Sequence, residues 1–211
     1  MIRRRPLRGR PLLRRRALRR SPRSPVPGPG IRARPVLPPR VREALARANR
    51  LMADGQFAEA AAAFESLAVK AREHSMPGRA ADLMLQAARA HFAAGAIDAA
   101  MAGATEALRL LALSGRVGRI PAVLSKMTAA LRAKGYDAHA ERLEQEADRI
   151  LSGVGLSLDE AQQQAPQMPE EAGTLPAKCD GCGAPVIPDE VEWHDARTAE
   201  CLYCGTVLKV T

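Results

Sequence analysis

All four cysteines of the chain lie near its C-terminal end, in two C-x-x-C-G pairs: Cys179 with Cys182, and Cys201 with Cys204. Two residues between paired thiolates let one tight turn point both sulfurs at a single ion, and a second pair completes a tetrahedral four-thiolate shell. The glycine after each pair suits a sharply turning backbone with positive φ. Two disulfides or two redox dithiols are the alternatives. The matched spacing favours one structural Zn(II) ion held by all four cysteines, because such a shell is closed.

Short β-prone runs surround the cysteine pairs. They predict strands at 186–187, 191–193, 199–201 and 207–210. With these strands and the cysteine frame, residues 179–211 resemble the zinc-ribbon superfamily. The resemblance implies zinc ligation by Cys179, Cys182, Cys201 and Cys204 and nothing beyond it. A unit of 33 residues has too little core to fold alone, so we expect the metal to supply much of its folding free energy.

Two other residues of this segment have side chains that suit a functional site. His194 lies between the cysteine pairs and would be a ligand only in place of a cysteine; since the fourth cysteine is present, we expect an exposed hairpin residue. Trp193 is expected to pack beneath the ribbon, with an exposed contact aromatic as the alternative.

From residue 41 to 151 the apolar residues recur at helical spacing, three and four apart. Gly55, Gly95 and Gly135 stand 40 residues apart and mark turns between paired helices. Alanine supplies much of the apolar content and aromatics are only 3% of the chain, which favours closely packed helices. The pattern predicts helices at 41–53, 57–73, 79–94, 97–113, 119–134 and 137–151.

The turn and second helix of the first unit read Gly55-x-Phe57-x-x-Ala60, followed by Phe64 and Leu67. This pattern resembles a tetratricopeptide repeat, and the residues around Gly95 resemble it again, although the period is 40 rather than 34 residues. The resemblance implies a mainly α fold, a right-handed solenoid of about three helical hairpins that acts as a protein-binding scaffold. No ligand-binding residue carries over from it.

Residues 1–40 contain fourteen Arg and no acid, together with nine prolines. Such a tail cannot bury enough apolar surface to order itself, so we expect disorder. Three interpretations of this tail stay open: an electrostatic arm, an organellar leader, or untranslated GC-rich sequence. If the tail is untranslated sequence, the true start lies near residues 36–41. The remaining residues carry eighteen Lys and Arg against twenty-three Asp and Glu, so the folded part is mildly acidic.

Residues 152–178 are rich in glycine, proline and glutamine and are predicted to be a flexible linker. Within them Ser157 and Glu160 form a capping-box pattern, which predicts one short helix before Pro166. The sequence leaves open whether the ribbon docks on the helices.

The chain has none of the sequence motifs of nucleotide-binding loops, serine hydrolases or zinc proteases, so we expect no enzyme activity. The favoured function is a protein–protein interaction scaffold that binds another protein or a peptide and carries one structural zinc ion. The alternative is a nucleic-acid-associated factor that uses the ribbon and the basic tail, although residues 178–211 hold three Lys or Arg against six Asp or Glu. Without a transmembrane run or a signal-peptide core, and with cysteines at metal-binding spacing, we expect a cytoplasmic protein.

Overall fold

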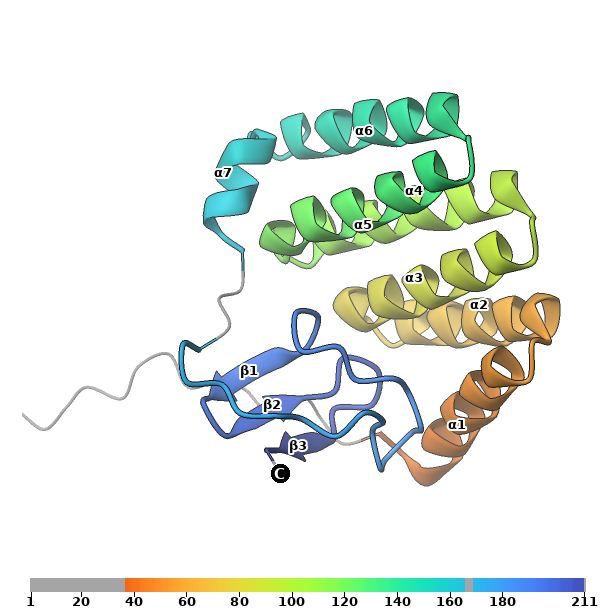
Figure 1. Ribbon diagram of the computed structural model, residues 1–211, viewed down its shortest axis with the longest axis vertical. Helices are drawn as coiled ribbons and strands as arrows, with labels where there is room; N and C mark the ends of the chain where they lie inside the picture. Colours follow the sequence, from red (N-terminus) through yellow and green to blue (C-terminus); the bar gives the residue numbers. More distant parts are fainter. Residues whose placement is uncertain (1–36, 166–168, 211) are drawn as a thin grey trace, which may run out of the picture. The chain divides into compact units, whose positions relative to one another are not determined.

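The computed structural model describes residues 37–165 and 169–210 of the chain. They are mainly helical, with a small three-stranded antiparallel sheet at the C-terminal end, as predicted (Figure 1). The predicted tail falls almost entirely outside the described residues. The helices of this part of the chain are α1 (Pro39–Ala53), α2 (Phe57–Glu73), α3 (Pro77–Ala93), α4 (Ile97–Leu113), α5 (Ile120–Ala133), α6 (Asp137–Ser152) and α7 (Leu158–Gln163).

The helices end in one recurring way. At the end of α1, the Gln56 N–H donates to the Leu51 carbonyl and the Gly55 N–H donates to the Met52 carbonyl. These are the two hydrogen bonds of a Schellman motif, which requires a residue with positive φ between them. Gly55 has a φ of 76°, which glycine adopts without steric cost.

The same pair of hydrogen bonds closes α2, α3, α4, α5 and α6. The residues with positive φ at these ends stand 20 residues apart, half the interval visible in the sequence. They are Gly55, Ser75, Gly95, Gly115, Gly135 and Gly155. A serine stands at the second of these positions and glycines stand at the other five, four of them consecutive at the 20-residue interval.

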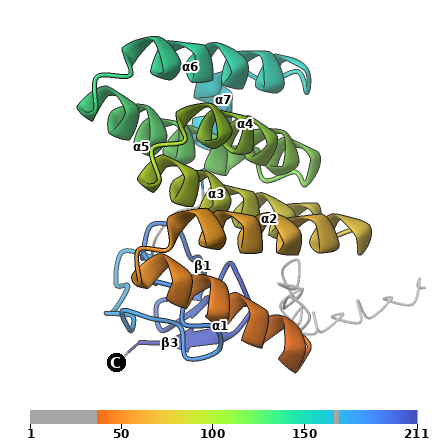
Figure 2. The same ribbon diagram turned by 90° about the vertical axis from the view of Figure 1, so that its right-hand side faces the viewer.

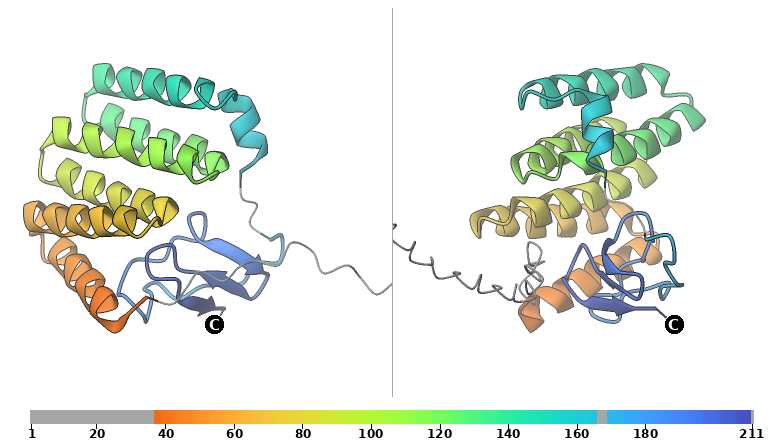
Figure 3. Two further views of the ribbon diagram at one scale, coloured as in Figure 1. Left: turned by 180° about the vertical axis from the view of Figure 1, so that it is seen from behind. Right: turned by 90° about the vertical axis from the view of Figure 1, so that its left-hand side faces the viewer.

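Small side chains let neighbouring helices approach closely. Ala60, Ala61 and Ala104 are fully buried, in keeping with the close helix packing that the alanine content predicts. Phe64 and Leu108 are also buried and fill the space between helices. Helices α1 to α4 pack in sequence order, α6 contacts both α4 and α5, and the views in Figures 2 and 3 show the helices stacked from α1 to α6.

The predicted helix bounds lie within two residues of the observed ones. The largest differences are at α1 and α3, which begin two residues early, at Pro39 and Pro77. Proline suits the first turn of a helix because its missing N–H would have no partner there. Before α5, residues Val117–Arg119 form one turn of 3₁₀-helix, and Pro121 lies in the first turn of α5.

The sheet consists of β1 (Glu192–Asp195), β2 (Thr198–Glu200) and β3 (Val207–Lys209), joined in that order by antiparallel pairing. The strand predicted at 186–187 is wrong. The backbone there instead closes a narrow loop around the first cysteine pair, through a bridge between Lys178 and Pro185. The other three strands are present with bounds shifted by one or two residues.

The segment between α6 and the sheet contains α7, whose capping box is confirmed. The Glu160 N–H donates to Ser157 Oγ over 3.2 Å, and the Ser157 N–H donates to the Glu160 carboxylate over 2.8 Å. Further along, Leu175 is buried and the Gly173 N–H donates to the Ala196 carbonyl. These contacts connect the segment to the turn between β1 and β2.

Candidate metal centre

The two cysteine pairs form turns with the same hydrogen bonds. In the first, the Cys179 N–H donates to the Ala184 carbonyl and the Gly183 N–H donates to the Cys179 carbonyl. In the second, the Cys201 N–H donates to the Thr206 carbonyl and the Gly205 N–H donates to the Cys201 carbonyl. Gly183 and Gly205 have φ values of 71° and 73°, so the predicted positive φ after each pair is confirmed.

These turns bring all four predicted cysteine side chains into one cluster. Their sulfur atoms lie within 4.8 Å of one another, and all four residues are buried. Across the two turns, the Sγ atoms of Cys179 and Cys204 are 3.5 Å apart, and those of Cys182 and Cys201 are 3.8 Å apart. The cysteines are free rather than disulfide-bonded. A cluster of this kind could hold one metal ion.

Crowding makes the four thiols titrate differently. Hydrogen bonds from Cys182 and Cys201 lower the pKa of Cys179 to about 7. Hydrogen bonding with Cys179 raises the pKa of both Cys182 and Cys201, and lowers the pKa of Cys204. Four thiolates this close cannot all exist without a compensating positive charge. Full ionisation of the four thiols would therefore require a cation at the cluster.

One polar neighbour, Thr206, borders the cysteine cluster, whereas His194 and Glu200 contact each other on the sheet. Thr206 Oγ1 lies 3.1 Å from Cys204 Sγ, within reach of donating to a thiolate. His194 lies in β1 with Nε2 3.3 Å from the Glu200 carboxylate. The His194 side chain is only 17% exposed, so the expectation of an exposed hairpin residue is wrong. The Glu200 carboxylate on β2 holds the imidazole against the sheet.

Trp193 is half-buried and packs against the core, as expected. Its Nε1–H donates to the Pro188 carbonyl over 3.0 Å. The indole thereby ties β1 to the loop that precedes it.

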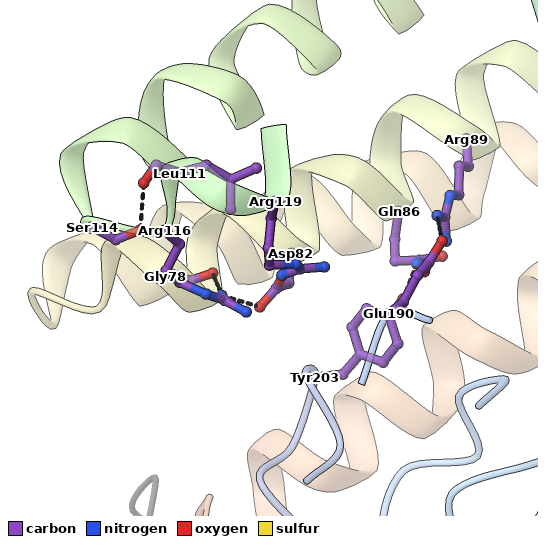
Figure 4. A network of polar contacts seen from close by, with 10 residues as sticks. All are labelled: Gly78, Asp82, Gln86, Arg89, Leu111, Ser114, Arg116, Arg119, Glu190 and Tyr203. Carbon is purple, nitrogen blue, oxygen red and sulfur yellow. Dashed lines mark hydrogen bonds and ion pairs between the residues drawn. The ribbon is translucent and has the colours of Figure 1, made fainter. Parts of the chain in front are cut away.

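The cysteine-containing segment docks on the helices through both of its cysteine turns. Asn49 of α1 donates from Nδ2 to the carbonyl oxygen of Cys182 over 3.0 Å. Gln86 of α3 donates from Nε2 to the hydroxyl of Tyr203, which lies between Cys201 and Cys204 (Figure 4). Tyr203 is buried, and burial raises the pKa of its hydroxyl. This hydroxyl is therefore neutral.

A third docking contact comes from the loop before β1. The Glu190 carboxylate accepts from Arg89 of α3 over 2.7 Å and from Lys126 of α5 over 3.2 Å. Burial opposes ionisation of Glu190, but the positive charges of Arg89 and Lys126 outweigh it and lower the carboxyl pKa. The side chain of the neighbouring Asp189 is 70% exposed, and its carboxylate lies 4.0 Å from the Lys126 ammonium.

A second buried ion cluster lies on the helices alone (Figure 4). The Asp82 side chain of α3 is 1% exposed and contacts the guanidinium groups of Arg116 and Arg119. Arg116 also donates to the Gly78 carbonyl, over 3.1 Å. This cluster connects the start of α3 to the segment before α5. Helices α4 and α5 make few contacts with each other.

An apolar pocket of about 150 Å³ opens between α3, α4 and α5. Its partly exposed walls include Phe92, Val123 and Met127, and Arg89 and Lys126 stand on the same lining. Among the described residues, no helix combines the length and apolarity needed to cross a bilayer.

The sequence predicts the cysteine cluster but not the docking contacts. Asn49, Gln86 and Arg89 are separated from their partners by 133, 117 and 101 residues respectively. Tyr203 offers the one signal in the sequence, because a large aromatic between two paired cysteines must either cover the cluster or contact another element.

Comparison with protein-family models, with curated protein sequences and with solved structures finds no match to this chain.

Proposed function

We propose that the chain is a non-catalytic protein-binding scaffold, in which a TPR-like right-handed solenoid of helical hairpins carries a C-terminal zinc ribbon. The observation that carries this proposal is the closed cluster of four buried thiols in a chain whose helices also hold an apolar pocket. Four protein ligands leave no coordination position for substrate, which is typical of structural metal sites.

Zinc is the ion that fits this cluster best. Four sulfurs at tetrahedral corners, each about 2.3 Å from one ion, lie about 3.8 Å apart. The separations of 3.5 and 3.8 Å between the two turns are close to that value. Thiolate ligands favour zinc over the hard cations magnesium and calcium. The thiols must stay reduced to bind it, which suits the cytoplasm.

The helical pocket supports binding to a protein segment. Phe92, Met101 and Met127 line it, and methionine side chains adapt to different apolar partners. The Lys134 ammonium lies 4.3 Å from the centroid of the Phe92 ring and adds positive charge to this region. The ribbon has more acidic than basic residues, which supports a protein partner over the alternative of a nucleic acid.

Site-specific photo-cross-linking in cells tests this proposal. A benzophenone amino acid at Met127, in the pocket, should cross-link the full-length chain to a small, discrete set of proteins. The matched control places the same group at Ser125, which is exposed on α5 and does not line the pocket. Equal cross-linking at both positions, or cross-linking only to nucleic acid, would contradict the proposed function.

A further inference from the structure

The ribbon docks on the helices with groups that belong to its own cysteine turns. The Cys182 carbonyl accepts from Asn49 of α1, and Tyr203, inside the second turn, meets Gln86 of α3. The positions of this carbonyl and this ring are set by the turns. Whatever holds the four sulfurs together therefore also holds the docking groups in place.

The ribbon has few other means of keeping that shape. Its three strands are three or four residues long, and its buried apolar side chains are few. In small units of this kind, metal binding supplies folding free energy directly. Removing a metal from the cluster should therefore unfold both turns and withdraw the docking groups together.

The boundary between ribbon and helices carries charged side chains and is incompletely filled. A cavity of about 240 Å³ lies along it, lined by Arg119 and Lys126 from the helices and by Glu190 and Leu202 from the ribbon. Contacts of this kind depend on exact placement of charged groups rather than on a large apolar area. The helices keep their own buried core, so they can persist when the ribbon leaves.

We propose that metal occupancy of the four-cysteine cluster controls whether the ribbon covers the polar face formed by Gln86, Arg89 and Lys126. With metal bound, Glu190 holds Arg89 and Lys126 at the edge of the apolar pocket. With metal removed, the ribbon unfolds and uncovers these residues while the helices stay folded. The proposal deepens the proposed function, since the uncovered face adjoins the pocket assigned there to a protein partner.

Lysine acylation followed by mass spectrometry tests this coupling on the full chain. Lys126 is 44% exposed and paired with Glu190, whereas Lys70 is an exposed lysine on α2. Treating the metal-loaded protein with a chelator should raise the acylation rate of Lys126 by about threefold or more, because its carboxylate partner leaves. The rate at Lys70 and the helical circular dichroism should stay unchanged.

Two variants distinguish loss of the contact between Glu190 and Lys126 from a general increase in the mobility of the protein. Glu190→Gln should raise the Lys126 rate with metal still bound, whereas Asp189→Asn, at the exposed neighbour, should not. The coupling is overturned if the chelator leaves the Lys126 rate unchanged, if Lys70 changes equally, or if the helical signal collapses with the metal. It is also overturned if Glu190→Gln has no effect. These results do not depend on any partner, so they stand apart from the cross-linking test.

Discussion

Ser75 has a φ of 55° although it carries a side chain, and among the described residues it is the one non-glycine residue with positive φ. It stands where five other helix ends have glycine. A left-handed backbone costs a side-chain-bearing residue roughly 1–2 kcal/mol, because Cβ crowds the following carbonyl. The residue is exposed, so its side chain offers little packing in return.

Ser75→Gly should therefore stabilise the protein. We expect the free energy of unfolding to rise by about 1 kcal/mol, after allowing for the greater freedom of glycine in the unfolded chain. Urea unfolding followed by helical circular dichroism measures the change. The converse substitution, Gly95→Ala, should destabilise by a similar amount for backbone reasons alone, since a Cβ at Gly95 would meet no atom within 4 Å. A loss of stability in Ser75→Gly would mean that the α2 end does not need a left-handed residue.

At the scale of elements, the helices could be predicted closely because each has its own local signals. Apolar spacing set their extents, and glycines set most of their ends to within two residues. The strands were less predictable. Residues Val186 and Ile187 are β-branched and apolar, yet they form no strand. The Val186 N–H donates to the Ala177 carbonyl beside the single bridge at Pro185, and the Ile187 carbonyl accepts within a turn.

The packing of α7 depends on the absence of a side chain at Gly118. A Cβ at this position would overlap the carbonyl group of Gln164, directly after α7. The turn containing Gly118 and the helix α7 are in contact. Glycine is therefore needed here for close backbone approach rather than for positive φ.

Gly118→Ala should displace α7 and destabilise its packing by about 1–3 kcal/mol, the usual cost of inserting a methyl group into a filled space. Amide hydrogen exchange at residues 158–165 should speed up, with α2 unaffected. Gly78→Ala is the matched control, because its Cβ would meet first the flexible Arg116 side chain, at 3.3 Å. Unchanged exchange in α7 would show that Gln164 can move aside without cost.

At the scale of the whole molecule, the cysteine cluster was predictable and its attachment to the helices was not. Ligand spacing within a turn is a local property, so the sequence indicates it directly. The contact between Glu190 and Arg89, in contrast, depends on how segments 101 residues apart pack together.

We propose that the four cysteines bind one zinc ion and that this ion folds the C-terminal ribbon. Native mass spectrometry of the full-length chain, purified under reducing conditions with zinc present, tests it most directly. We expect one zinc ion per chain, and loss of that ion in Cys204→Ser with the helical circular dichroism retained. A metal-free chain whose mass is lower by the four hydrogens of two disulfides, or full zinc content in Cys204→Ser, would contradict the account.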